Sequence, residues 1–337
     1  MANATDEESG GSWIQYFNYS VTVVIAVVTI LGNLSIILVN TLPKQLRSKD
    51  SFILSGLALA DGLTGLARLQ LYVDRIGILY FKLHTLRLSA WDCISVSSVL
   101  TVFSLAAQGW MMVAVNGDRV LAVAKPLAYL SLTRKYRIGL LALVFGYSSL
   151  VAAVGVYLSY FHTSRDKVFS PICLTNWMFP QWFDYFLISS NALTGYASVL
   201  LYLAAVLVHR QKSNHQIGQL ASRSKQRRLE RQRKLTKIFG LVAVCTVVFH
   251  CIPYSLIVGL KVFGLGMELF HKLATYLYMM SSINCMCNVF IYMWRLPEMR
   301  HAAVTLLCCR SGGLNRVEVI ANSKRVGGSS QRKETNF

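Results

Sequence analysis

A few polar side chains interrupt the long apolar stretches of this chain, and they are the residues best suited to chemistry. Asp61, Asn33, Asn284 and Asn288 fall at comparable depth within three of these stretches. Inside a membrane such side chains are costly unless they are paired or functional. They could form one polar cluster that holds water or a small cation. Alternatively, they form hydrogen bonds between helices that serve packing only.

A second candidate is the adjacent acid and base, Asp118 and Arg119, at the inner end of the third apolar stretch. The two charges can neutralise each other at rest. Arg119 can then turn inward when neighbouring helices part, which exposes a cavity for a cytoplasmic partner. The alternative is an arginine that only extends toward the membrane interface, as is common at the ends of membrane spans.

Seven apolar stretches must position these residues, and each is long enough to cross a bilayer. They cover roughly residues 19–41, 51–72, 92–124, 136–160, 183–209, 235–262 and 268–294. A hydrocarbon core needs about 20 helical residues, and its backbone must satisfy its own hydrogen bonds. A barrel would need shorter alternating segments. The predicted fold is an all-α membrane protein, a seven-transmembrane helix bundle over residues 19–295.

The distribution of positive charge predicts the orientation of this bundle. The 337 residues are 54% hydrophobic and carry a net charge of +19, concentrated in alternate connectors. Basic residues near spans stay in the cytoplasm. Residues 1–18 are acidic and are expected outside as an extracellular segment, with Asn3 in a glycosylation sequon. The carboxyl end is expected inside, and the whole protein in the plasma membrane.

Cysteine placement agrees with this topology. Of eight cysteines, only Cys93 and Cys173 fall on the outer side. Two thiols in an oxidising compartment should pair in a disulfide; the alternative is two unpaired cysteines. On the inner side, residues 296–309 have the spacing of an amphipathic helix on the membrane surface, and Cys308 and Cys309 are candidate palmitoylation sites. Residues 310–337 form a tail expected to be disordered.

The motifs, taken in order, resemble those of a rhodopsin-type (class A) G-protein-coupled receptor over all seven spans. The matching pieces are Gly32-Asn33, Leu57-Ala58-Leu59-Ala60-Asp61, Asp118-Arg119, the Cys93/Cys173 pair, Pro253, Asn284 and Asn288-Val289-Phe290-Ile291-Tyr292. Leu46-Arg47-Ser48-Lys49 and the 288–295 run look more particularly like nematode serpentine chemosensory receptors.

The resemblance implies a role for each matching residue. Arg119 would engage a heterotrimeric G-protein, with Asp118 restraining it, and Tyr202 and Tyr292 would swing toward Arg119 in the active state. Asn33, Asp61, Asn284 and Asn288 would form the central polar site, with a sodium ion at Asp61 and no other cofactor. Pro253 would act as a hinge in the sixth span, since proline breaks the backbone ladder. The family's tryptophan and proline near these motifs are replaced by Cys251 and Val289, which leaves the ligand trigger to other side chains.

A ligand pocket is expected in the outer half of the bundle. Its candidate residues are Arg68, Thr101, Leu105, Trp177, Tyr254, Ser255 and Tyr278. Arg68 could bind a ligand carboxylate, or it could pair with Asp74 or a backbone carbonyl. No acid of the third span stands near Thr101, which disfavours an amine ligand. The expected ligand is a short peptide or a small chemosensory molecule.

Other classes of protein have less support in the sequence. A membrane transporter or channel is the alternative function, but the seven spans show no internal repeat and few buried charges. A membrane enzyme would need paired carboxylates or a metal-binding cluster, and Asp61 and Asp118 lie at different depths. The basic connectors lack any nucleic-acid-binding motif, so the expected partners are an extracellular ligand, a G-protein and membrane lipids.

Overall fold

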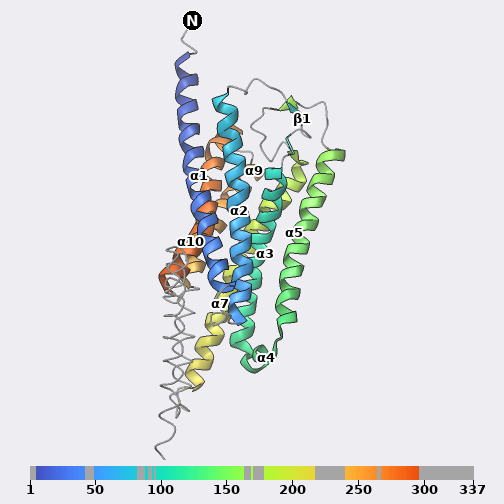
Figure 1. The fold of residues 1–337 in the computed structure, drawn as a ribbon, viewed down its shortest axis with the longest axis vertical. Helices are drawn as coiled ribbons and strands as arrows, with labels where there is room; N and C mark the ends of the chain where they lie inside the picture. The colour runs from blue at the N-terminus through green and yellow to red at the C-terminus, as the bar shows by residue number, and fades with distance from the viewer. Residues whose placement is uncertain are drawn as a thin grey trace, which may run out of the picture.

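The computed structural model describes residues 5–41, 49–81, 88–89, 93–94, 96–162, 168–169, 178–216, 240–263 and 267–295. Long helices lie side by side in one bundle (Figure 1). In chain order the helices are α1 (Thr5–Thr41), α2 (Lys49–Tyr80), α3 (Val96–Ala124), α4 (Pro126–Ser131), α5 (Arg134–His162), α7 (Gln181–Gln216), the π-helical turn η3 (Val247–Cys251), α9 (Ile252–Val262) and α10 (Met267–Arg295).

Six of the described helices are long and apolar enough to cross a membrane: residues 13–41, 52–80, 97–124, 134–161, 181–212 and 240–262. Helix α10 is the seventh long helix of the bundle, and it packs against α1, α2 and α9. Its middle contains Ser281, Ser282, Asn284 and Asn288, which lower its hydropathy. The all-α seven-helix bundle predicted from the sequence is confirmed.

The two ends of the bundle differ. Strand β1 (Leu88–Ser89) pairs with strand β2 (Val168–Phe169) in antiparallel fashion. Figure 1 shows this pair at the end where α1 begins, and the short α4 at the opposite end. We call them the β end and the α4 end. Apart from the two-residue strands, every element that the structure describes is helical.

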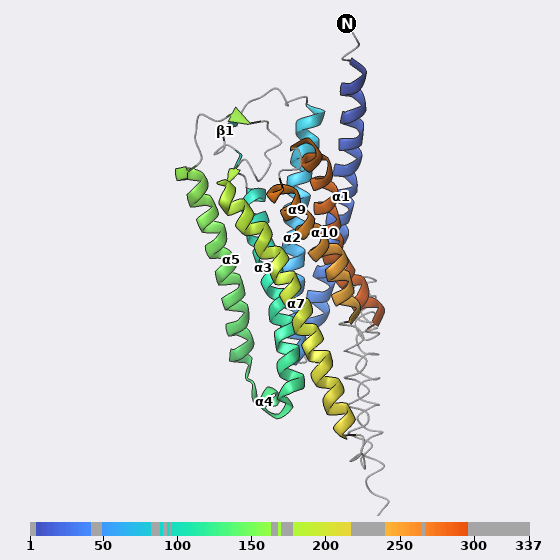
Figure 2. The same cartoon turned by 180° about the vertical axis from the view of Figure 1, so that it is seen from behind.

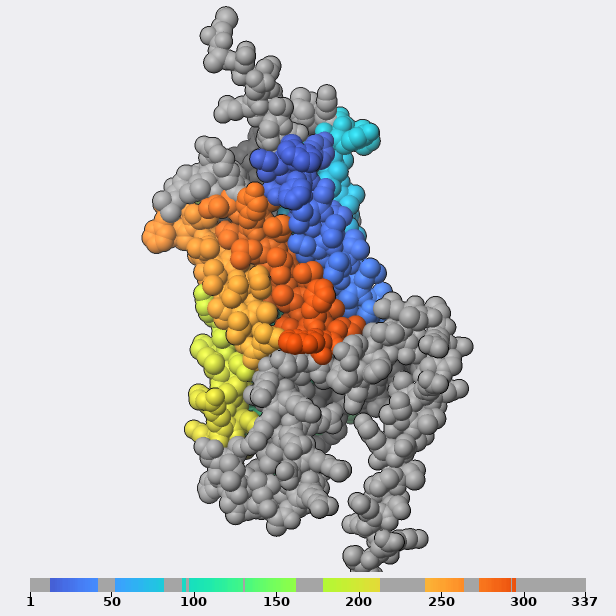
Figure 3. All heavy atoms as spheres, turned by 90° about the vertical axis from the view of Figure 1, so that its left-hand side faces the viewer, coloured from blue at the N-terminus to red at the C-terminus, as the bar shows by residue number. Residues whose placement is uncertain are grey.

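Helix α3 occupies the middle of the bundle. It packs against α2, α5 and α7, and Figure 2 shows α7 lying across it. Helix α1 packs against α2 and α10, and Figure 3 shows α1 (blue) beside α10 (orange to red) on one face. Ala107, Gln108 and Met111 of α3 are fully or almost fully buried, so α3 holds the centre of the core.

The bundle has apolar side chains on its outer surface and polar side chains in its interior. Leu143, Leu193 and Leu200 are more than 60% exposed, whereas Asp61 and Asn284 are fully buried. This reverses the pattern of a water-soluble bundle. It is the arrangement expected when lipid surrounds the helices.

Some sequence-based boundaries differ from the structure. Helix α1 begins at Thr5, earlier than the span predicted from residue 19, because the polar residues before the span continue the helix. Helix α7 continues past the predicted end of its span to Gln216. Several predicted features lie outside the described residues: Asn3, Cys173, Trp177, the 296–309 helix with Cys308 and Cys309, and the 310–337 tail.

Candidate functional site

A cavity opens among the helices in the half of the bundle toward the β end. Helices α2, α3, α7, α9 and α10 all contribute to its wall. The wall is lined by Arg68, Leu71, Tyr72, Arg75, Thr101, Val102, Leu105, Asp184, Leu187, Ile188, Asn191, Tyr254, Lys261, Ala274, Thr275 and Tyr278. Most of this surface is aliphatic or aromatic, and a few charged groups interrupt it. This combination is usual for small-molecule sites.

Arg68 extends from α2 to α10 across one side of the cavity. Its side chain is buried, with 7% exposed. The guanidinium donates a hydrogen bond of 2.9 Å to the Ser281 hydroxyl and lies 6.0 Å from the centre of the Tyr278 ring. The pairing of Arg68 with Asp74 that the sequence left open is not seen, because Asp74 is on the exposed face of α2 and forms no ion pair with Arg68. Arg68 thus presents a positive charge inside an apolar wall.

Arg75 lies two turns farther along α2, in the same wall. Its guanidinium lies 6.0 Å from the ring centre of Tyr19 and 5.3 Å from that of Tyr72. Tyr19 and Tyr72 are also in contact, with ring centres 5.3 Å apart. The two rings therefore hold a second cation between α1 and the cavity.

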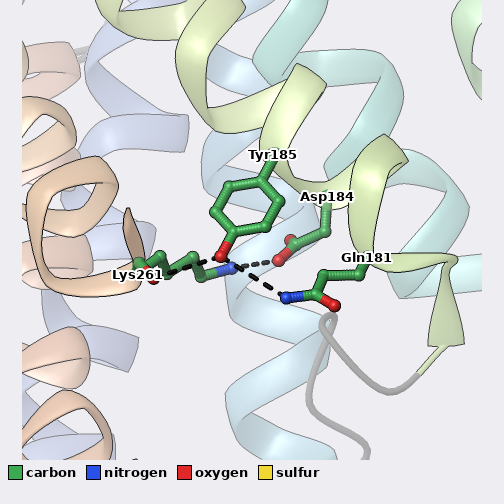
Figure 4. A network of polar contacts seen from close by, with 4 residues as sticks. All are labelled: Gln181, Asp184, Tyr185 and Lys261. Carbon is green, nitrogen blue, oxygen red and sulfur yellow. Dashed lines mark hydrogen bonds and ion pairs between the residues drawn. The ribbon is translucent and has the colours of Figure 1, made fainter. Parts of the chain in front are cut away.

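Asp184 of α7 and Lys261 of α9, both in the cavity wall, point toward each other, as Figure 4 shows. Asp184 is buried, Lys261 is partly buried, and the two side chains form an ion pair. The Tyr185 hydroxyl donates to the Lys261 carbonyl oxygen at 3.1 Å, and the Gln181 amide donates to the Tyr185 hydroxyl at 3.4 Å. Asp184 is the single carboxylate among the described residues of the cavity wall, and its charge is already matched by Lys261.

The structure brings together most of the pocket residues predicted from the sequence. Arg68, Thr101, Leu105, Tyr254 and Tyr278 all line the cavity. Ser255 does not; its hydroxyl lies 3.0 Å from that of Tyr196 on an exposed part of the bundle. Successive residues of a helix point in different directions, so Tyr254 and Ser255 cannot both face the cavity. Trp177 lies outside the described residues.

The sequence did not identify Tyr72, Arg75, Asp184 or Lys261 as pocket residues. Lys261 and Asp184 lie near the ends of their helices, where a charge usually faces water. Their burial depends on α7 and α9 meeting across 77 positions of sequence. The spacing of Arg68 and Arg75, two helical turns apart, was the one available signal, because it places them on the same face of α2.

The central polar residues form a real cluster in the middle of the bundle. Asn288 of α10 donates to Asp61 of α2 at 2.9 Å, and Gln108 of α3 donates to the Cys285 sulfur at 2.9 Å. Asn284 contacts the Met112 sulfur at 3.9 Å. Asn33 instead donates to Thr29 of its own helix at 2.9 Å. The structure therefore joins Asn288 to Asp61 across α10 and α2 and places Asn284 against Met112 of α3, whereas Asn33 bonds within α1.

Three buried oxygens of this cluster have no hydrogen-bond partner among the described residues. They are the Asp61 Oδ1, Asn284 Oδ1 and Asn288 Oδ1 atoms. Carboxylate and amide oxygens are ligands that hard cations prefer. Within the described residues, no group of three or more His, Cys, Asp or Glu side chains could hold a metal ion. The donor set fits a small monovalent cation or water.

A π-helical turn lies directly before Pro253. In η3 the Ile252 amide donates to the Val247 carbonyl, five residues earlier. His250 is fully buried there, and its Nε2 atom lies 3.1 Å from the Asn191 carbonyl oxygen of α7. Proline lacks an amide hydrogen, so the ladder is already broken at Pro253. π-turns of this kind are frequent at functional sites, so the geometry suits the predicted hinge.

At the α4 end, Asp118 is bound by a residue outside its own helix. The Tyr129 hydroxyl of α4 donates to the Asp118 Oδ2 atom at 2.8 Å, and both side chains are buried. Arg119 is half-buried. The sequence did not identify Tyr129, although it stands in the short segment after Lys125-Pro126. Asp118 thus anchors α4 against α3.

The remaining predicted switch residue with a described side chain, Tyr202, lies on α7 toward the same end. The Tyr202 hydroxyl lies so close to Gly240 that a Cβ atom added there would collide with it. Tyr202 therefore packs against the start of the 240–262 span. Lys212 of α7 donates to the carbonyl oxygens of Val123 and Ala124 at 3.0 and 2.6 Å. The Tyr292 side chain is outside the described set. Helix α7 therefore contacts both α3 and the sixth span at the α4 end.

Cys93 is disulfide-bonded and buried beside α3. Its predicted partner, Cys173, lies outside the described residues, so the pairing itself stays a prediction. Strands β1 and β2 end four residues before Cys93 and Cys173 respectively. Their pairing brings the two connectors together.

A bundle of seven long helices, with a cavity toward one end and an Asp-Arg pair at the other, defines a seven-helix receptor. The model of the serpentine type 7TM GPCR chemoreceptor Srsx family matches residues 26–307. The chain belongs to this family. Its relationship to the class A receptors, expected from the motifs, is confirmed.

Curated relatives support the same class. The chain is 26% identical to the trace amine-associated receptor 7f of Mus musculus over 294 residues, which cover 80% of this chain and 77% of that receptor. It is 30% identical to the muscarinic acetylcholine receptor M3 of Pongo pygmaeus over 128 residues, 37% of this chain. That second match spans 20% of the muscarinic receptor's length. The family is one of receptors and not of enzymes.

Proposed function

We propose that this protein is a chemoreceptor of the plasma membrane that binds an extracellular ligand in the cavity and activates a heterotrimeric G-protein at the α4 end. The observation that carries the proposal is the separation of two sites along one helix. Thr101 of α3 lines the cavity, and Asp118 and Arg119 stand near the other end of α3. A ligand that moves the helices around the cavity would thereby change the surface at the α4 end.

The proposed orientation places the amino terminus and the β end outside the cell. It rests on the acidic amino-terminal segment and on the basic connectors at the α4 end, because basic residues near spans stay in the cytoplasm. Family membership supports it further. In this orientation the cavity faces the medium and Arg119 faces the G-protein.

An amine ligand has little support in the cavity, although one relative is named for trace amines and another for acetylcholine, which carries a quaternary ammonium group. Thr101 stands on the α3 wall, where a cationic ligand would need a carboxylate. Asp184 is ion-paired with Lys261, so it would have to give up that partner. A small chemosensory molecule without a positive charge fits better.

We also propose a sodium ion at Asp61. Support comes from the three buried oxygens of Asp61, Asn284 and Asn288 that lack hydrogen-bond partners among the described residues. Asp61 is the charged member and would supply most of the attraction. Such an ion would favour the arrangement of α2 and α10 in which Asn288 donates to Asp61.

Substitution of Arg119 tests the function. Cells expressing the chain with several Gα subunits are screened against chemical libraries, and responses are measured as second messenger. Arg119→Ala should abolish ligand-evoked signalling while surface expression persists. Arg134→Ala, an exposed arginine at the same end, is the matched control and should signal. Unchanged signalling by Arg119→Ala would show that this residue does not engage the G-protein.

A further inference from the structure

Among the described residues, the cavity wall contains three cationic side chains, Arg68, Arg75 and Lys261, and one carboxylate, Asp184. Lys261 and Asp184 pair with each other, and Arg75 lies against the Tyr19 and Tyr72 rings. The positive charge of Arg68 is therefore the one that matters for a ligand.

The environment of Arg68 is costly for a cation. The side chain is buried at 7% exposure, and its guanidinium contacts the Ser281 hydroxyl and the Tyr278 ring. No carboxylate of the described residues forms an ion pair with it. A guanidinium has five N–H donors, and a buried charge without a counter-charge is destabilising. A bound anion would offset this cost and would meet the planar donor fork in its preferred bidentate geometry.

A second donor stands in the same wall. The Tyr254 hydroxyl is buried and has no hydrogen-bond partner among the described residues. Tyr254 packs against Tyr278, with ring centres 6.5 Å apart, and Tyr278 is the ring beneath Arg68. The hydroxyl of Tyr254 and the guanidinium of Arg68 thus border the same aromatic group, and each has hydrogen-bonding capacity left for a ligand.

The rest of the wall indicates what the uncharged part of the ligand should be. Leu71, Val102, Leu105, Leu187 and Ile188 present aliphatic surface. They would bury an apolar body, at about 25 cal/mol for each Å² removed from water. A small inorganic anion would leave this surface uncovered, whereas an amphiphilic acid would cover it.

Resting on the proposed function, we infer that the ligand is a small organic acid: an anionic group bound by Arg68, joined to an aliphatic or aromatic body that lies against the leucine-rich wall. Arg75 lies two helical turns farther along α2 and would attract the acid to the cavity. The Asp184–Lys261 pair would disfavour amines, because an amine would have to compete with Lys261 for the single acid.

The test uses compounds that share a body and differ in charge. The full-length protein is placed in phosphatidylcholine nanodiscs, whose lipids carry no net charge, so that the free acid is the only added organic anion. Thermal unfolding is measured with phenylacetate, phenylacetamide and 2-phenylethylamine, and with hexanoate, hexanamide and hexylamine. We expect a carboxylate to raise the Tm at millimolar concentration and its matched amide and amine to do so less.

Variants assign the effect to Arg68. Arg68→Gln should weaken carboxylate binding by about ten- to a hundred-fold, as expected for loss of a charged hydrogen bond. Arg210→Gln, an exposed arginine near the other end of α7, should bind like the wild type. Arg68→Lys keeps the charge without the fork and should bind about ten-fold more weakly. If Arg68→Gln does not fold, the carboxylate affinity of Arg68→Lys tests the role of Arg68 instead.

Three outcomes would overturn the inference: no carboxylate raises the Tm, the amines raise it as much as the acids, or the substitutions at Arg68 leave the affinity unchanged. The measurement needs no G-protein, so it separates the two proposals. Acid binding without any G-protein response contradicts the proposed function alone. A G-protein response to the amines alone contradicts the organic-acid ligand and leaves the proposed function standing.

Discussion

The charged side chains of the cavity differ in whether an opposite charge lies beside them. Lys261 and Asp184 form a largely buried ion pair between α7 and α9, whereas Arg68 contacts a hydroxyl group and an aromatic ring. Breaking a buried pair by removing one partner leaves the other charge uncompensated. Removing both charges together can leave the stability of the fold nearly unchanged. The ion pair therefore has a clear signature in a double-mutant cycle.

The first prediction concerns this ion pair. Lys261→Met leaves the Asp184 carboxylate buried without its partner and should lower the stability by up to about 3–5 kcal/mol. The double variant Asp184→Asn/Lys261→Met should recover most of the loss. Thermal unfolding in detergent, followed by intrinsic fluorescence, measures both. Equal Tm values for the single and double variants would show that the pair contributes nothing as a pair.

The second prediction concerns the central cluster. Asp61→Asn keeps an oxygen that can accept from Asn288 but removes the charge. We expect sodium chloride to raise the Tm of the wild type more than choline chloride does at equal ionic strength. In Asp61→Asn this difference should disappear. A sodium effect of the same size in both proteins would favour the packing-only interpretation.

Prediction from the sequence worked at residue scale where a side chain acts within a long, regular helix. Arg68, Asp61 and Tyr254 were identified because their depth in a span follows from counting along it. The Asp184–Lys261 pair was missed because it depends on how two helix ends meet. Tyr129 was missed for a similar reason, since its partner Asp118 is reached by a turn of the chain.

At the scale of elements, close helix contacts depend on glycines at α7 and α3. A Cβ atom at Gly195 would lie 2.7 Å from the His250 ring and 2.9 Å from the Cys251 sulfur. One at Gly109 would overlap the Thr194 hydroxyl. At both glycines the added Cβ atom would come closer to its neighbours than atoms in a packed core tolerate. Gly195 therefore sets how closely α7 approaches η3.

The third prediction follows from this contact. Gly195→Ala should destabilise the bundle by about 1–3 kcal/mol, because the added methyl group must displace His250 or Cys251. Gly146→Ala in α5 is the matched control, since a methyl group added there would meet no atom within 4 Å. The control should be neutral or stabilising by up to about 1 kcal/mol. Unfolding temperatures of the two purified variants test the difference; a stable Gly195→Ala would show that α7 can move away freely.

Hydropathy predicted the existence and order of the spans, because the need to bury the backbone in lipid leaves few alternatives to a helix. It could not predict where polar residues extend a helix beyond the membrane, as at Thr5 and Gln216. The π-helical hydrogen bond from Ile252 to Val247 was also not predictable, since both hydrogen-bond patterns use the same apolar residues.

For the whole molecule, the orientation of the bundle decides what each end can do. The cavity opens in the half toward the β end, and Asp118 and Tyr129 meet at the α4 end. Seven spans would place the two termini on opposite sides of the membrane. Sensing and signalling can then be separated by the lipid bilayer.

The fourth prediction tests that orientation. An epitope tag before Met1 should bind antibody on intact cells, and a tag after Phe337 should bind only after permeabilisation. A tag of the same sequence at the amino terminus of a cytosolic protein is the control for cell integrity. Detection of both tags on intact cells, or of neither, would contradict the seven-span arrangement.

The turn at 247–251 changes how substitutions along this span must be interpreted. A π-turn uses about one more residue per turn than an α-helix, so the azimuth of every later side chain is offset by about 100° from a regular helical wheel. A single wheel drawn from Gly240 to Val262 would assign Tyr254 and Lys261 to the wrong side. Scanning mutagenesis of this span therefore requires two wheels, one on each side of His250.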